Sequence, residues 1–198
     1  MLTFRYSWVY DQTWKNFLKV NSAADVYPAS EETRRSIGRI GRLWYPLEGR
    51  IISAISESSH LRWKVGNIDC YLVGRCRPIS DPLTIMPFRK DNEIVNTLTH
   101  ELIHQIMIQN SRELRIAREF INNKYGEESQ ITLNHIFLFA VYAKIYPKVL
   151  EKRELGGQIL QPSERDYARA WEIVNKEGYE NIILEVVNRL TDNKTSNG

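Results

Sequence analysis

The sequence predicts an α+β protein, and three observations lead to that class. The N-terminal residues alternate between apolar and polar, short strand-like segments occur before residue 90, and apolar residues recur at helical spacing almost continuously from Asp91 onward. A small sheet followed by a mainly helical half is an α+β layout. The chain of 198 residues is long enough to bury a core, and we expect one domain over residues 1–198.

The first half, residues 1–90, is expected to hold a small mixed sheet and one long helix. Residues 2–8 alternate as a half-buried strand does. A long helix is expected to open at Ser30, because apolar residues repeat at three- and four-residue steps over residues 37–55. Pro46 falls inside this pattern, so we expect it to kink or divide the helix.

Further strands are expected between the long helix and residue 90. Three segments have strand-like composition and lie between turn signals: "LRWKV" (61–65), "IDCYLVG" (68–74) and "LTIMPF" (83–88). The last of these follows a Pro-rich turn, "RPISDP".

The second half is expected to be helical. Its helices are predicted over residues 91–109, 112–124, 128–146, 163–176 and 179–191, with Asp91, Ser111 and Ser163 as N-caps. Residues 91–146 would contain the metal-binding helices, and residues 147–191 a helical buttress. The polar residues 192–198 are expected to form a frayed tail.

Composition narrows the possible functions. With 42% hydrophobic and 26% charged residues, the chain is typical of globular proteins, and its net charge of +3 is scattered among acids, so we expect no nucleic-acid partner. It has no apolar run long enough for a bilayer and no signal-like N-terminus, so we expect no membrane partner and a cytoplasmic location. Cys70 and Cys76 match neither a zinc-type nor a redox-type pair.

The segment "NTLTHELIHQIM" carries the most specific chemical signal. It places His100, Glu101 and His104 in an H-E-x-x-H arrangement on an expected helix. Residues four apart lie on one face of a helix, so both imidazoles can reach one ion. Glu101 lies about 100° round the helix from His100, where its carboxylate can act on a water beside the metal without binding the metal itself. Metal-assisted hydrolysis needs this geometry.

The surroundings of the motif favour a metal site over two core histidines that fell four apart by chance. An apolar stripe opposite the histidines gives the helix a face to bury in a core; it is formed by Val95, Leu98, Leu102 and Ile106. The residues around the motif are uncharged, so no neighbour in the helix competes for the metal or pairs with Glu101.

The segment "TLTHELIHQI" resembles the active-site helix of the zincin metallopeptidases, whose helix also surrounds H-E-x-x-H with uncharged residues. The resemblance is specific over about ten residues. It implies one Zn²⁺, Glu101 as general base, and an edge strand before the helix that binds a peptide or protein substrate in extended form. "LTIMPF" stands in that place, and strand addition there is physically sensible.

The sequence leaves several candidates for the third zinc ligand. Met107 and Asn110 stand where the metzincin pattern has glycine and histidine, and no Asn-Glu pair of the gluzincin type follows His104, so the subfamily stays open. We favour His135, which lies on an apolar helix face. The alternatives are Glu128, which would make the protein similar to minigluzincins, followed by Glu127, Glu119 and His60.

These expectations converge on a zinc-dependent peptidase. Zinc held by His100, His104 and His135 would activate water for hydrolysis of a peptide bond, with Glu101 as base. Two alternatives remain: a zinc-binding protein of zincin-like fold without peptidase activity, and a helical interaction module in which the motif is accidental. The sequence predicts neither the oligomeric state nor the cleavage preference.

Overall fold

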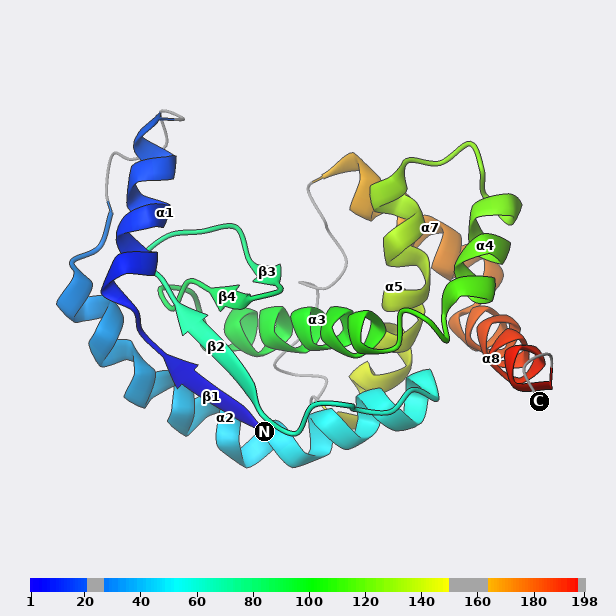
Figure 1. Ribbon diagram of the computed structural model, residues 1–198, viewed down its shortest axis with the longest axis horizontal. Coiled ribbons are helices and arrows are strands. Elements are labelled where there is room, and N and C mark those ends of the chain that lie inside the picture. Colours follow the sequence, from blue (N-terminus) through cyan, green and yellow to red (C-terminus); the bar gives the residue numbers. More distant parts are fainter. Residues whose placement is uncertain (21–26, 150–163, 196–198) are drawn as a thin grey trace. The chain divides into compact units, whose positions relative to one another are not determined.

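The computed structural model describes residues 1–20, 27–149 and 164–195 (Figure 1). The chain divides into two compact units. The first comprises Met1–Gly49 and Val65–Gln105, and the second comprises Arg50–Lys64 and Ile106–Gly198. Within the described ranges, no helix combines the length and the apolar character needed to cross a bilayer. A small sheet together with many helices confirms the predicted α+β class.

The sheet of the first unit has four strands in the order β1-β2-β4-β3. The strands are β1 (Leu2–Arg5), β2 (Ile68–Leu72), β3 (Ile79–Ser80) and β4 (Leu83–Ile85). β1 pairs with β2 in parallel, β2 pairs with β4 in parallel, and β3 pairs with β4 antiparallel. The sheet is therefore mixed, as expected.

The expectation that "LTIMPF" forms an edge strand is wrong. Its strand, β4, is hydrogen-bonded on one side to β2 and on the other to β3, and its three residues are buried. The edge is β3, which lies inside the segment "RPISDP" that the sequence indicated as a turn. Two prolines flank this strand and hid it, because a residue pair between prolines has the composition of a loop.

Helix α1 (Trp8–Val20) was not predicted. The alternating pattern of the first residues extends to Trp8, whereas β1 ends at Arg5. The helix is held by Asp11, a fully buried carboxylate in its first turn. Asp11 accepts hydrogen bonds from the Tyr27 hydroxyl at 2.5 Å, the Gly74 amide at 2.8 Å and the Tyr6 hydroxyl at 3.0 Å.

Helix α2 (Ser30–Ser59) begins where expected and is not divided by Pro46. A proline inside a helix removes one backbone hydrogen bond and costs about 3 kcal/mol. Burial on both sides of the proline offsets this cost, because Trp44 and Ile51 are both fully buried. The helix also fastens the sheet: the buried Glu48 carboxylate accepts hydrogen bonds from the Leu2 amide at 2.6 Å and the Trp44 indole at 3.1 Å.

Helix α3 spans Asp91–Gln109, the bounds that the sequence predicts. The apolar stripe predicted for this helix is buried: Leu98, Leu102 and Ile106 are all 0% exposed and Val95 is 5% exposed. Arg39 of α2 holds the start of the helix, because its guanidinium donates hydrogen bonds to the Asp91 carboxylate and the Pro87 carbonyl.

The second unit is helical. Its helices include α4 (Arg115–Lys124), α5 (Gln130–Val149), α7 (Arg165–Glu177) and α8 (Tyr179–Thr195). α5 packs against α7 and α8, and α4 packs against α8. Lys124 joins α4 to two other helices, since its ammonium group lies 2.8 Å from Glu177 and 3.1 Å from Glu185.

Several boundaries in the second unit differ from expectation. Ser111 is not an N-cap, because α4 is preceded by Leu114 and starts three residues later than predicted. The predicted cap Ser163 lies outside the described residues. Helix α8 continues to Thr195, beyond the predicted end at residue 191. The segment "LRWKV" is not a strand.

Side chains hold the segment 61–65 in place of a strand partner. The Asn110 amide donates to the Arg62 carbonyl at 2.8 Å, and the Gln109 side chain accepts from the Lys64 amide at 2.9 Å. The Trp63 indole donates to the Ile52 carbonyl at 3.2 Å. The alternating sequence suggested a strand, but the backbone hydrogen bonds of this segment go to side chains.

Candidate metal site

Helix α3 places the two histidines of the motif side by side. The ring centroids of His100 and His104 are 4.9 Å apart, with 72° between the ring planes. Both residues are half-buried. The spacing of four residues puts both histidines on one face of α3. The opposite face carries the buried apolar stripe, which fixes the orientation of the helix.

Glu101 lies beside this pair in an apolar environment. Its residue is only 7% exposed. Burial raises the pKa of the carboxyl group from its ordinary value of 4.5 to about 7, while a hydrogen bond with the Ser80 side chain acts in the opposite direction. A carboxyl group with a pKa near neutrality can both accept and return a proton at physiological pH.

The edge strand β3 is tied to α3 next to the motif. Ser80 contacts Glu101 through its side chain, and the Gln105 side chain donates a hydrogen bond to the Ser80 carbonyl. Sequence reasoning missed Ser80 and Gln105. No signal in the sequence could have assigned them, because β3 itself was hidden between prolines.

His135 lies on α5 and is held in one tautomer. Its Nδ1 is 2.7 Å from the Ile131 carbonyl oxygen, which can only accept, so Nδ1 carries the proton. The neutral ring therefore has its lone pair on Nε2. A metal-binding histidine commonly has this arrangement, in which the other ring nitrogen donates to a carbonyl. The ring stacks against Tyr167 and Phe139, with centroids 4.4 Å and 5.5 Å away, and only 6% of the residue is exposed.

His100 and His104 of the first unit form a pair of imidazoles that could hold a metal ion. His135 belongs to the second unit and offers a further imidazole. The donor type fits zinc, because imidazole suits zinc.

The other candidates for a third ligand make different contacts. Glu128 forms an ion pair with Arg169 at 2.7 Å, and Glu119 forms one with Arg115 at 2.7 Å. Glu127 is exposed in the turn before α5, and His60 is exposed just after the end of α2, with a positive φ of 57°. Exposed ion pairs of this kind occur commonly on helix surfaces.

The two cysteines are unsuited to metal binding or nucleophilic attack. Both are free thiols and both are buried. Burial raises the pKa of Cys70 well above its ordinary value and that of Cys76 to about 12, so both remain protonated at neutral pH.

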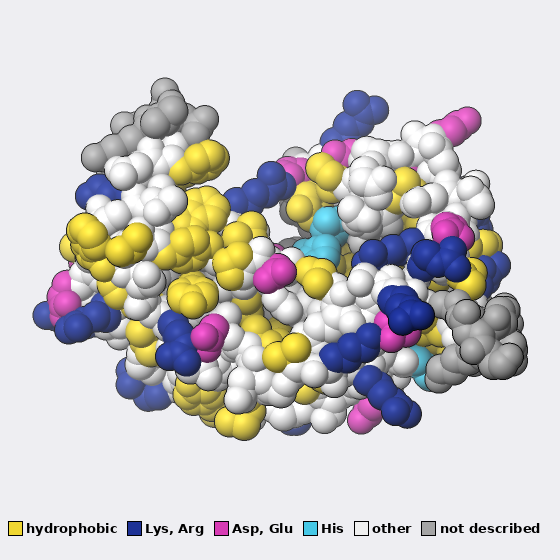
Figure 2. Space-filling model, viewed as in Figure 1, with side chains coloured by type: hydrophobic (Ala, Val, Ile, Leu, Met, Phe, Trp, Pro, Cys, Tyr) yellow, Lys and Arg dark blue, Asp and Glu magenta, His cyan; other side chains and the backbone are white. Residues whose placement is uncertain are grey.

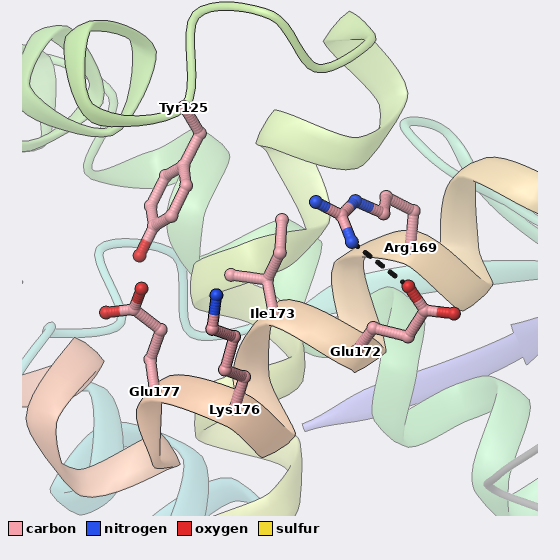
Figure 3. Close-up of a pocket in the computed structure, with 6 residues that line it drawn as sticks. All are labelled: Tyr125, Arg169, Glu172, Ile173, Lys176 and Glu177. Carbon is pink, nitrogen blue, oxygen red and sulfur yellow. Dashed lines mark hydrogen bonds and ion pairs between the residues drawn. The ribbon is translucent and has the colours of Figure 1, made fainter.

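A hollow of about 510 Å³ lies in the second unit (Figure 3). It is lined by Tyr125, Arg169, Glu172, Ile173, Lys176 and Glu177. Arg169 is paired with Glu172 at 3.1 Å, and Glu177 is paired with Lys124 at 2.8 Å. These ion pairs neutralise much of the charge at the hollow. The hollow therefore supports a ligand-binding role less well than the histidines do.

Comparison with known proteins found no relative of this chain. No family model matches it, and no match was found among curated proteins or among solved structures.

Proposed function

We propose that the protein is a zinc-dependent metallopeptidase of the zincin type, in which His100, His104 and His135 hold one zinc ion. The observation that carries the proposal is the pair of His100 and His104 imidazoles, with ring centroids 4.9 Å apart, on the same helix as the buried Glu101. Three histidines with a fourth position left for water form a known type of catalytic zinc site.

The proposed roles follow from position and burial. Bound zinc would supply a Lewis acid that lowers the pKa of water and polarises the scissile carbonyl. Glu101 removes the proton from the attacking water at its carboxylate oxygen and transfers it to the leaving amine.

The proposed substrate is a peptide in extended conformation. An edge strand can accept a further strand through backbone hydrogen bonds. β3 lies at the edge of the sheet, and Ser80 of this strand contacts Glu101. A peptide beside β3 would therefore run close to the proposed base.

The test is Glu101→Gln, with Glu93→Gln on the same helix as the matched control. Glu101→Gln should retain zinc and lose on the order of 10² to 10⁴ in hydrolytic rate, because it removes the base but neither histidine. Glu93→Gln should keep both properties. Cleavage of randomised internally quenched peptides and the zinc content of each protein are the measurements. Full activity in Glu101→Gln would refute the mechanism, and zinc without hydrolysis in the natural protein would favour the zinc-binding alternative.

A further inference from the structure

The edge strand β3 presents Ser80, and not Ile79, to helix α3. Residues that pair across two strands point to the same face of a sheet, whereas successive residues of one strand point to opposite faces. Ile79 pairs with Thr84 of β4, whose hydroxyl lies 3.0 Å from the Tyr10 hydroxyl of α1. Ile79 therefore belongs to the face that α1 contacts. Ser80 belongs to the opposite face, where its side chain contacts Glu101.

Helix α3 holds Ser80 at two points. The Ser80 hydroxyl contacts the Glu101 carboxylate, and the Ser80 carbonyl accepts a hydrogen bond from the Gln105 side chain. Glu101 and Gln105 are four residues apart, so they lie on one face of the helix, ~6 Å apart along its axis. This face is about 100° round the helix from the one that carries His100 and His104. The strand therefore contacts α3 beside the histidines, at the glutamate.

A glutamate that acts as a base needs a fixed direction. The Glu101 side chain has three rotatable bonds, and a base must lie within hydrogen-bond reach of the proton that it removes. A hydroxyl donor selects one direction of the carboxylate, because a hydrogen bond to a charged group is stronger than one between neutral groups. The donor must itself be held, and the Gln105 bond to the Ser80 carbonyl holds it.

We propose that Ser80 is a positioning residue for Glu101. Its hydroxyl donates a hydrogen bond to the carboxylate and fixes the direction in which the base points, while Gln105 fixes the backbone of Ser80. This inference rests on the proposed peptidase function. Neither Ser80 nor Gln105 takes part in proton transfer, since both act through Glu101.

The first experiment separates kcat from KM in the zinc-loaded, full-length protein. Ser80→Ala should lower kcat on an internally quenched peptide roughly tenfold, because it removes one hydrogen bond to a charged group. KM and zinc content should not change, since the variant keeps the backbone of β3 and both histidines of α3. Ser80→Thr, which keeps the hydroxyl, should restore kcat. An unchanged kcat in Ser80→Ala, or no recovery in Ser80→Thr, would overturn the inference.

Gln105 can be tested in the same assay. Gln105→Met keeps the length of the side chain but removes the amide donor, so it should lower kcat in the natural protein. In the Ser80→Ala background it should cause no further loss, because the hydroxyl that Gln105 holds in place is already absent. Equal fold losses in the two backgrounds would contradict the role of Gln105.

The second experiment needs no activity and measures melting temperatures. Ser80→Ala should lower the melting temperature of the natural protein, and should lower that of Glu101→Leu less, because leucine offers the hydroxyl no acceptor. The matched control is Ser36→Ala, which removes a hydroxyl that donates to the Thr33 carbonyl at 2.6 Å in the same unit. It should cause equal shifts in both backgrounds. Equal shifts for Ser80→Ala would show that its hydroxyl does not act on Glu101 and would overturn the inference.

The two proposals fail in different ways. A natural protein that cleaves no peptide when loaded with zinc contradicts the proposed function and with it this inference. A natural protein that cleaves peptides, but whose kcat is the same in Ser80→Ala, contradicts only the role of Ser80.

Discussion

At the scale of single residues, the sequence predicted the candidate ligands in two ways. His100 and His104 belong to one short motif, whereas His135 lies far from that motif in the sequence. The spacing of His100, Glu101 and His104 was visible in the sequence because residues four apart share a helix face. His135 was favoured only as a histidine near an incomplete site. What the sequence could not predict is its tautomer, because the hydrogen bond to the Ile131 carbonyl depends on the local geometry of α5.

The third ligand can be tested by comparing two substitutions. His135→Ala should weaken zinc binding by on the order of 10- to 100-fold or more, because it removes a donor nitrogen, whereas Glu128→Ala should leave zinc binding unchanged, because Glu128 pairs with Arg169. Competition with a chelating dye measures both affinities. If Glu128→Ala weakened zinc binding and His135→Ala did not, the third ligand would have to be reassigned.

The thiols provide a prediction that is independent of the metal. Cys70 and Cys76 are buried, and burial raises the pKa of Cys76 to about 12, so the reactive thiolate is scarce at pH 8. The folded protein should react with a disulfide reagent far more slowly than the protein in urea. Absorbance of the released thiolate follows the reaction. Two thiols that react as fast in the folded protein as in urea would be incompatible with this burial.

At the scale of elements, the predictions were accurate where the residues within an element determine its structure without contacts to distant segments. α3 was predicted at its observed bounds because its apolar stripe repeats without interruption. β3 and α1 were missed. β3 has two residues and needs β4 to exist as a strand, and α1 follows β1 too closely for a change of period to be visible. Pro46 was expected to kink or divide α2, and burial on both sides explains why the helix is not divided.

Helix α1, which was not predicted, exposes several large apolar residues. Trp8, Val9 and Phe17 are 62%, 68% and 58% exposed, and apolar side chains gather over this helix in Figure 2. A shallow groove of about 260 Å³ runs along Tyr10, Thr13, Trp14 and Phe17.

The attachment of α1 depends on Asp11, and this can be measured. Asp11→Ala should lower the free energy of unfolding by about 3 kcal/mol, since it leaves several buried donors unpaired. Tyr6→Phe, which removes one of the same hydrogen bonds, should cost about 1 kcal/mol. Urea unfolding followed by circular dichroism gives both values. A cost for Asp11→Ala no larger than that for Tyr6→Phe would contradict the described network.

At the scale of the whole molecule, the α+β class could be predicted because the strand-like segments all lie before residue 90, whereas helical spacing is almost continuous after it. The pairing order of the strands could not, since it depends on contacts between segments far apart in sequence, such as Leu2 with Ile68. The same limit applies to function. A motif on one helix predicts metal binding, but it does not identify the third ligand that the proposed site needs.

The most direct test of the central claim is the zinc content of the purified, untagged protein, measured by plasma mass spectrometry beside the double variant His100→Ala/His104→Ala. We expect about one zinc ion per chain, as three protein ligands imply for a single site, and its loss in the variant. No zinc in the natural protein, even after incubation with excess metal, would contradict the account and leave the histidines of α3 and α5 as parts of the core.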